Sequence, residues 1–201
     1  MTKPVFYLLA GPNGAGKSTL FRSAVAQGLI PGDVPFVNAD VHEASSLQHV
    51  TDPLQRSRAA QAWADAERTR LLGAGASFVS ETVFSHTSKL DLMAAAKRAG
   101  FVVVLLVVCV DEPDLLLSRV AQRVQEGGHP VPPQRILARY PRTVRHLAVA
   151  IRTADLAMLY DTSLPAGEVV QPPRMVARLR GGQLVWRSNT LPAWAEAMVG
   201  A

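Results

Sequence analysis

The stretch Gly11-Pro-Asn-Gly-Ala-Gly-Lys-Ser-Thr19 decides the fold of this 201-residue chain. It fits the phosphate-binding pattern G-x-x-x-x-G-K-[ST] at every fixed position. The apolar run Val5–Ala10 before it predicts a buried strand, and residues 19–27 after it predict a helix. The pattern therefore stands in the strand, loop and helix context that it requires, and it predicts a loop that binds the phosphates of a nucleotide.

The loop residues differ in their expected roles. Glycines let the backbone curl so that successive N–H groups, at the positive end of the helix, point at the phosphates. Lys17 would bridge the β- and γ-phosphates, and the Ser18 hydroxyl would complete the coordination of Mg²⁺. The predicted nucleotide-binding residues are Gly11, Asn13, Gly14, Ala15, Gly16, Lys17, Ser18 and Thr19.

Length and composition indicate one α/β domain over residues 1–201. The single cysteine, Cys109, lies in the apolar run Phe101–Val110, where we expect a small buried hydrophobe. That run of ten residues is far shorter than a membrane span, and Val5–Ala10 is too brief for a signal peptide. We therefore expect a cytoplasmic protein that does not engage a membrane.

Basic residues gather in one segment. The formal net charge is +5, yet Arg119–Arg152 alone holds seven arginines against one acid, Glu126. Such charge beside a phosphate loop indicates an anionic substrate or a clamp on transferring phosphates. Solvated helix faces and nucleic-acid binding are the alternatives. Nucleic-acid binding would favour interleaved aromatic residues, whereas this segment contains only Tyr140, so nucleic acid is not an expected partner.

Two acidic residues follow predicted strands. Phe36–Asn38 predicts a second strand before Asp40, and residues 76–80 predict a third before Glu81 and Thr82. In an open parallel sheet these strand ends line the ligand crevice, which would place both acids near the γ-phosphate. Asp40 could accept the proton of a substrate hydroxyl, and Glu81 could contact the metal's water shell or a substrate hydroxyl. Either acid could instead cap the helix that follows it.

Two arginine-bearing helices predict a lid at about residues 119–145. The first begins at Pro113, carries Arg119 and Arg123, and is expected to be capped by Asp111-Glu112. The second is predicted over Gln134–Tyr140. A turn rich in glycine and proline joins them and could act as a hinge, so that the lid closes over the phosphates and excludes water. His129 in this turn is expected to hydrogen-bond within the loop.

The remaining elements follow from periodicity and turn residues. The dense β-branched run Phe101–Val110 predicts a central parallel strand. A glycine pair between two short apolar-alternating runs predicts a hairpin at the C-terminal end, packed on the main domain. The other expected elements are helices over Leu54–Leu72 and Ser88–Ala99, a strand over Asp155–Tyr160, hairpin strands over Arg174–Arg180 and Gln183–Arg187, and a helix over Leu191–Val199.

Over roughly residues 5–163 the sequence resembles the zeta-toxin-like family of P-loop kinases, particularly its short bacterial members. Four stretches carry the likeness: Gly11–Thr19, Val37–Asp40, Glu81–Ser85, and the block from Arg119 through Gly127-Gly-His-Pro-Val-Pro132 to Tyr140. The resemblance implies an α/β P-loop kinase core with a five-stranded parallel sheet flanked by helices, a helical lid, and ATP with Mg²⁺ as cofactors.

The resemblance also implies an activity and residue roles. The activity is phosphorylation of a hydroxyl on UDP-N-acetylglucosamine or a related nucleotide sugar. Asp40 matches the aspartate that deprotonates the substrate, and Glu81, followed by Thr82, matches the glutamate at the substrate edge. Arg123, with Arg135 or Arg139, matches the lid arginines on the phosphates. Toxin members pair with an antitoxin, which is expected here as a separate protein because the phosphate loop begins at residue 11.

Two stretches depart from the family pattern. The last strand ends in Asp161-Thr-Ser163 in place of Asp-Asn-Ser, and Phe84-Ser-His86 replaces Leu-Ser-Ser near the expected substrate pocket. Two alternatives therefore stay open beside the nucleotide-sugar kinase. One is a kinase of another metabolite or antibiotic hydroxyl, and the other is a nucleotide-operated regulatory ATPase.

Overall fold

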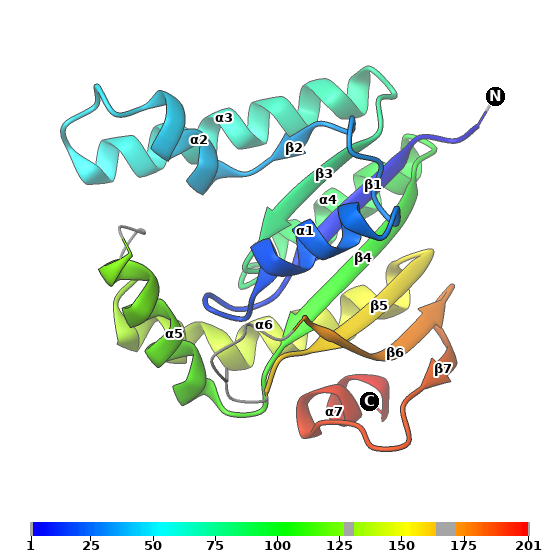
Figure 1. Cartoon of the computed structure of the whole chain (residues 1–201). Helices are drawn as coiled ribbons and strands as arrows, with labels where there is room; N and C mark the ends of the chain where they lie inside the picture. Colours follow the sequence, from blue (N-terminus) through cyan, green and yellow to red (C-terminus); the bar gives the residue numbers. More distant parts are fainter. Residues whose placement is uncertain (1, 127–130, 164–171, 201) are drawn as a thin grey trace.

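The computed structural model describes residues 2–126, 131–163 and 172–200, built around a seven-stranded sheet of order β2-β3-β1-β4-β5-β6-β7 (Figure 1). The strands are β1 (Val5–Ala10), β2 (Phe36–Val37), β3 (Phe78–Thr82), β4 (Val102–Cys109), β5 (Leu156–Asp161), β6 (Arg174–Arg180) and β7 (Gln183–Arg187). The helices are α1 (Lys17–Ala26), α2 (Ala39–Ser46), α3 (Pro53–Gly73), α4 (Ser88–Arg98), α5 (Pro113–Gln125), α6 (Pro133–Thr153) and α7 (Ala193–Gly200).

The sheet combines a parallel core with an antiparallel end. Strands β2, β3, β1, β4 and β5 are parallel, which confirms the predicted core. The predicted hairpin also forms, but it continues the sheet and is not simply packed on it. Strand β6 pairs antiparallel with β5, from Leu156 opposite Arg180 to Asp161 opposite Arg174. Without the hairpin the edge of β5 would expose unpaired backbone groups, and an antiparallel strand satisfies them.

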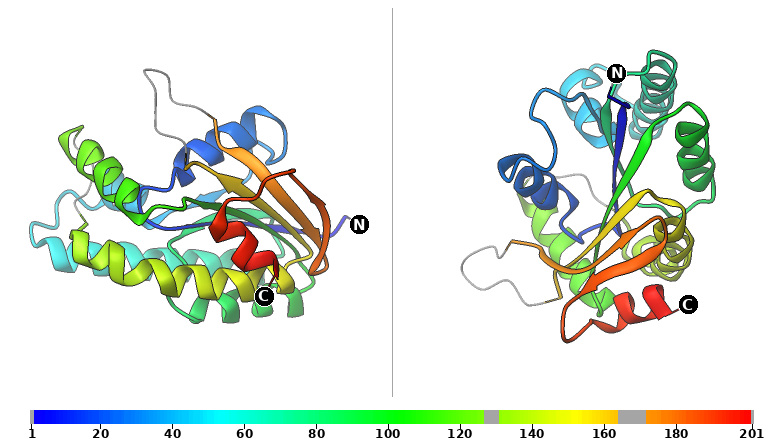
Figure 2. Two further views of the ribbon diagram at one scale, coloured as in Figure 1. Left: turned by 90° about the horizontal axis from the view of Figure 1, so that it is seen from below. Right: turned by 90° about the vertical axis from the view of Figure 1, so that its right-hand side faces the viewer.

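Apolar layers cover both faces of the sheet. Buried residues of α3, α4, α6 and α7 pack on one face, and those of α1 and α5 pack on the other (Figure 2). Strand β4 lies between the layers and is buried at every position after Val102, including Cys109, as the apolar run predicts. None of the helices in the described ranges is long and apolar enough to cross a membrane.

Helix α6 is longer than the sequence predicts. The predicted helix covers Gln134–Tyr140, whereas α6 runs from Pro133 through Pro141 to Thr153. A proline inside a helix removes one backbone hydrogen bond. Here Leu147 and Ile151 bury an apolar stripe beyond it, and tertiary burial of this kind outweighs local propensity. The predicted hinge turn falls largely on residues 127–130, so His129 lies outside the described residues.

The carboxyl ends of the parallel strands gather the loops that matter for function. The Gly11 N–H, directly after β1, donates to the Thr82 carbonyl at the end of β3 over 3.3 Å. The Thr162 N–H, directly after β5, donates to the Cys109 carbonyl at the end of β4 over 3.1 Å. The phosphate loop therefore lies at the edge of the sheet where open α/β proteins bind their ligands.

Candidate active site

The phosphate loop has a backbone shape that depends on its glycines. Gly14 and Gly16 have φ of 81° and 92°, a left-handed region that favours glycine. A Cβ atom at Gly11 would lie 2.0 Å from the Val108 carbonyl oxygen, and one at Gly14 would lie 2.8 Å from the Leu116 carbonyl oxygen. Strand β4 and helix α5 thus pack directly against the loop, and both contacts require glycine.

Lys17 is the buried cation of the loop. Its side chain is 8% exposed, and its Nζ donates to the Pro12 carbonyl over 3.0 Å and lies 3.8 Å from Glu81 Oε1. Burial lowers the pKa of Lys17, while the nearby carboxylates of Glu81 and Asp40 oppose that change. A poorly solvated ammonium of this kind attracts a phosphate more strongly than a surface lysine does.

Asn38 joins the two acidic residues that the sequence predicted. Its Oδ1 accepts from the Asp40 and Val41 N–H groups, over 2.9 and 3.2 Å, and its Nδ2 donates to Glu81 Oε2 over 3.0 Å. Asn38 is therefore the N-cap of α2, with Asp40 in the first turn. The alternative in which Asp40 or Glu81 caps a helix is wrong, because Glu81 lies in β3 and Thr87 precedes α4.

Glu81 lies beside Lys17 in a largely buried part of the site. Burial raises the pKa of Glu81, and the Lys17 ammonium partly counters that rise. Each group of this ion pair is held by a second contact, Lys17 by the Pro12 carbonyl and Glu81 by the Asn38 amide. The pair is therefore fixed in position, and its protonation is sensitive to any charge that enters beside it.

Two cavities meet at this ion pair. The P-loop cavity, about 300 Å³, is bounded by the phosphate loop, α5 and the ends of β5 and β6. The α3-side cavity, about 350 Å³, is bounded by α2, α3, the segment after β3, and α6. Lys17, Glu81 and Arg123 line both cavities. A reacting group in one cavity would thus face a reacting group in the other across these three side chains.

The structure brings most of the predicted loop residues to the cavities. Gly14, Gly16, Lys17, Ser18 and Thr19 line the P-loop cavity. Asn13 lines the α3-side cavity, and its buried Oδ1 has no hydrogen-bond partner among the described residues. Gly11 and Ala15 are buried and line neither cavity, and their predicted nucleotide-binding role stays a prediction.

The other predicted site residues gather in the α3-side cavity. Asp40, Thr82, Arg135 and Arg139 all line it, together with Arg123, which also faces the P-loop cavity. Burial lowers the pKa of Arg139, and the neighbouring cations Arg135 and Arg142 add to that effect. Like charges held this close favour an anion between them.

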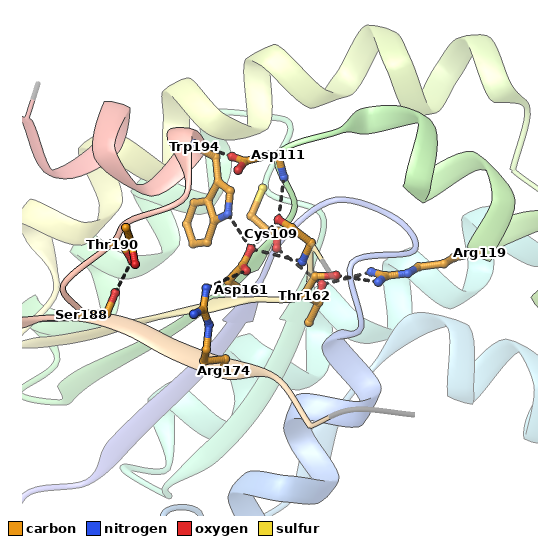
Figure 3. A network of polar contacts seen from close by, with 10 residues as sticks. Cys109, Asp111, Arg119, Asp161, Thr162, Arg174, Ser188, Thr190 and Trp194 are labelled. Atoms are coloured by element: carbon orange, nitrogen blue, oxygen red, sulfur yellow. Dashed lines mark hydrogen bonds and ion pairs between the residues drawn. The ribbon is translucent and has the colours of Figure 1, made fainter. Parts of the chain in front are cut away.

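Arg119 lines the P-loop cavity, unlike Arg135 and Arg139, which line the α3-side cavity. It donates from Nη1 to Thr162 Oγ1 over 3.1 Å and from Nη2 to the Thr162 carbonyl over 2.6 Å (Figure 3). Thr162 Oγ1 in turn donates to the Ala15 carbonyl over 3.0 Å. Thr162, one of the departures from the family pattern, thus ties α5 to the phosphate loop and to the end of β5.

Asp161 and Asp111 fasten the C-terminal segment to the sheet. Asp161 Oδ1 accepts from the Trp194 indole N–H over 3.1 Å, and Asp161 Oδ2 lies 3.4 Å from Arg174 Nη2 (Figure 3). Asp111 Oδ1 accepts from the Trp194 backbone N–H over 2.9 Å. The predicted cap Asp111-Glu112 is confirmed in part: Glu112 occupies the N-cap position of α5, without a side-chain hydrogen bond to the helix. The part that assigned Asp111 to this cap is wrong, because its carboxylate accepts from the first turn of α7.

A strained turn forms one wall of the α3-side cavity. Phe84 is fully buried with φ of 60°, and among the described residues it is the one non-glycine with positive φ. Its N–H donates to Thr82 Oγ1 over 3.1 Å. From α6, Thr143 Oγ1 donates to the Val83 carbonyl over 3.0 Å, and His146 Nδ1 lies 3.3 Å from the Phe84 carbonyl. Helix α6 therefore holds this turn and also carries Arg135 and Arg139.

Several cavity residues were not predicted from the sequence. Asn38 was assigned to a strand, Arg68 and Lys89 lay within predicted helices without an assigned role, and Glu43 was not singled out. Glu43 is 9% exposed and pairs with Arg56 over 3.3 Å, and Arg68 is 5% exposed. A buried charge in a helix leaves no local pattern, because its burial depends on the neighbouring element.

Comparisons with known proteins agree with this architecture. A family model described as an AAA domain (AAA_33) matches residues 7–147, and the chain belongs to that family. No curated protein matches the chain. Among solved structures, that of AvrRxo1-ORF1:AvrRxo1-ORF2 with sulphate ions matches with a TM-score of 0.70 at 22% identity, over 98% of this chain and 64% of that one.

Two further structures extend the comparison. The AvrRxo1-ORF1:-ORF2 structure with ATP matches with a TM-score of 0.68 at 22% identity, over 97% of this chain and 62% of that one. The PezAT chromosomal toxin-antitoxin system of the human pathogen Streptococcus pneumoniae matches with a TM-score of 0.61 at 18% identity, over 97% of this chain and 76% of that one. The chain thus spans less than two thirds of the AvrRxo1 chains it matches.

The family model and these matches agree with the α/β P-loop kinase fold that the sequence resemblance implied. At these sequence identities the solved structures establish the shared fold only. The substrate must be inferred from the residues of the site.

Proposed function

We propose that this protein is an ATP-dependent kinase of zeta-toxin type that phosphorylates a hydroxyl of a nucleotide sugar, with UDP-N-acetylglucosamine as the first candidate. The observation that carries the proposal is the meeting of two cavities at Lys17, Glu81 and Arg123. A transferase needs a donor and an acceptor in line on either side of the transferring group, and this arrangement supplies both places.

ATP would occupy the P-loop cavity. The glycine-dependent loop, the buried Lys17 ammonium and the start of α1 form a cradle that suits a triphosphate. Arg119 and Arg174 border the same cavity and would lie near the rest of the nucleotide. The AvrRxo1-ORF1:-ORF2 structure of the same fold was determined with ATP, which supports this choice of donor.

The chain's residues fit Mg²⁺ as the companion of ATP. No group of three or more His, Cys, Asp or Glu side chains in the described ranges could hold a metal by itself. This agrees with an ion that takes most of its ligands from phosphate oxygens and water, with the Ser18 hydroxyl as the protein ligand. When bound, Mg²⁺ would neutralise charge on the phosphates.

Asp40 would act on the acceptor hydroxyl. It lies in the first turn of α2, next to the Asn38 that holds Glu81, and it lines the α3-side cavity. A carboxylate here would orient the hydroxyl and accept its proton as the phosphoryl group transfers. Glu81 and Thr82 would accept hydrogen bonds from other acceptor hydroxyls, and Glu81 would also keep Lys17 in place.

The lid arginines would stabilise charge on the transferring group. Arg123 faces both cavities, so its guanidinium can contact donor and acceptor together. Arg135 and Arg139 line only the acceptor side and would contact an anionic acceptor. A diphosphate-bearing acceptor suits this surplus of cations better than a neutral sugar does.

A separate antitoxin protein is the proposed macromolecular partner. Support comes from the PezAT structure, whose fold this chain shares and which is a toxin-antitoxin system. Co-expression of the chain with candidate neighbouring proteins, followed by purification of a complex, would test the pairing.

A phosphate-transfer assay tests the proposed activity. The protein would be incubated with γ-labelled ATP and, at matched concentrations, UDP-N-acetylglucosamine, free N-acetylglucosamine or a dinucleotide. The proposal expects efficient transfer to the nucleotide sugar. Transfer to the free sugar with none to the nucleotide sugar would refute it and would favour a metabolite kinase. ATP hydrolysis that appears only with a macromolecule would favour a regulatory ATPase.

A further inference from the structure

The α3–α4 end of the α3-side cavity contains two cations that the proposed mechanism does not use. Arg68 comes from α3 and Lys89 from α4, and both line the cavity. The Arg68 side chain is 6% exposed and that of Lys89 is 22% exposed. Buried cations of this kind are costly unless something compensates their charge.

Among the described residues, a single carboxylate forms ion pairs with both Arg68 and Lys89. Asp65 Oδ1 pairs closely with Arg68 Nη2 and lies 4.0 Å from Lys89 Nζ. The Asp65 side chain is itself 67% exposed, so water weakens its hold on both partners. If Asp65 only formed a structural ion pair between α3 and α4, one cation would be enough to balance its charge. Two cations with one solvated acid leave a net positive charge facing the cavity.

The other carboxylates of this cavity do not balance that charge. Glu43 pairs with Arg56, Glu81 pairs with Lys17, and Asp40 forms no ion pair with Arg68 or Lys89 among the described residues. Burial lowers the pKa of Lys89, and the positive charge of Arg68 lowers it further. Both effects are expected where neighbouring carboxylates do not fully balance the positive charge. The charge of an entering anion would oppose this lowering of the Lys89 pKa.

Arg68 is also tied to the reacting edge of the sheet. Its Nη1 donates to Ser80 Oγ over 3.2 Å, and Ser80 directly precedes Glu81 in β3. The guanidinium is therefore fixed within one residue of the ion pair at which the two cavities meet. Arg135 and Arg139 approach the same cavity from α6, a different element.

We propose that Arg68 and Lys89 form an anion-binding subsite that holds a phosphate or carboxylate group of the acceptor while its hydroxyl faces Asp40. This inference rests on the proposed function and makes it more specific. It favours acceptors that carry a second anionic group besides the one that Arg135 and Arg139 would contact. Arg123 contacts the transferring phosphoryl group, and Arg135 and Arg139 contact one anionic group of the acceptor. The subsite contacts a second anionic group, in the part of the acceptor that does not react.

Binding measurements test the subsite without requiring catalysis. The full chain, saturated with Mg²⁺ and a non-hydrolysable ATP analogue so that the P-loop cavity is filled, would be titrated with pyrophosphate and separately with malonate. Lys89→Ala should weaken binding of the preferred anion about tenfold, the scale expected for one charge-assisted hydrogen bond. Lys89→Arg should retain most of the affinity, and malonate against pyrophosphate decides between carboxylate and phosphate.

Arg98→Ala is the matched control, because Arg98 lies on the same helix, is exposed and lines neither cavity. It removes the same charge and should change the affinity less than twofold. Equal affinities of wild type and Lys89→Ala would overturn the subsite, as would equal losses in Lys89→Ala and Arg98→Ala, or no binding of either anion by the wild type.

The transfer assay separates this inference from the proposed function. With a nucleotide sugar as acceptor, Lys89→Ala should raise the acceptor KM about tenfold and leave the ATP KM unchanged. An unchanged acceptor KM in an active variant would refute the subsite alone. Lys89-dependent anion binding without transfer to any acceptor would refute the kinase proposal and leave the subsite in place.

Discussion

Substitutions at Asn38 can separate helix capping from control of the site. Asn38→Ala removes the side-chain oxygen that accepts from two backbone N–H groups at the start of α2. It also removes the amide that donates to Glu81. Loss of the cap costs about 1 kcal/mol, and loss of a hydrogen bond to a charged group costs about 1.5–3 kcal/mol. At roughly 2–4 °C per kcal/mol for a chain of this size, Tm should fall by about 5–15 °C.

Asn38→Asp keeps the cap and changes only the contact with Glu81. It places a carboxylate where the Asn38 amide now lies, 3.0 Å from Glu81 Oε2. At that separation two such charges interact by about 5.5 kcal/mol at an effective dielectric constant of about 20. The pKa of Glu81, already raised by burial, should therefore rise further, so that the two acids share a proton at neutral pH.

The pH dependence of stability distinguishes the two variants. A carboxyl pKa that is raised in the folded state binds its proton more tightly there than in the unfolded chain, so the repulsion is relieved as pH falls. The stability deficit of Asn38→Asp should be largest near pH 8 and shrink toward pH 5, whereas that of Asn38→Ala should change little. Thermal unfolding across this range is the assay. Parallel deficits in both variants would refute the role given to the contact between Asn38 and Glu81.

Three further predictions concern the lid, the core and the phosphate loop. Arg123→Lys keeps the positive charge but loses the planar guanidinium fork, so turnover should fall by about 10² or more while ATP affinity stays nearly unchanged. The control Arg142→Lys, at a residue outside both cavities, should remain active, and steady-state kinetics would measure both variants. Burial raises the pKa of the Cys109 thiol to about 12, so a thiol reagent should label it only after unfolding, and rapid labelling of the native protein would contradict the buried strand. Gly11→Ala should destabilise the fold by at least about 1–3 kcal/mol because of the 2.0 Å contact, whereas Gly73→Ala, with nothing within 4 Å, should not, as denaturant titration can show.

The local chemistry of the sequence predicts the parts of the fold that short patterns determine. The phosphate loop, strand β4 and the glycine-turned hairpin lie where their residue patterns place them. The pattern also brings Asp40 and Thr82 to one cavity, because strand ends of a parallel sheet share an edge.

Features that depend on contacts between distant elements could not be predicted in this way. Helix α6 continues through Pro141 because its apolar face is buried by elements that local propensity does not include. Asp111 binds the backbone of Trp194, a partner 83 positions away, and no local pattern indicates such a contact. The same applies to the burial of Arg68 and to the contact of Asn38 with Glu81, since both depend on strand β3.

Transfer by Asp40→Asn tests the central claim most directly, because this substitution leaves the P-loop cavity intact and removes only the carboxylate on the acceptor side. Single-turnover transfer from γ-labelled ATP to UDP-N-acetylglucosamine would be compared between wild type and variant at equal ATP occupancy, established by calorimetry. A kinase that works across the two cavities predicts unchanged ATP affinity and a rate lower by about 10² to 10⁴, the usual scale for a positioned base. A rate within a few-fold of wild type would contradict the claim.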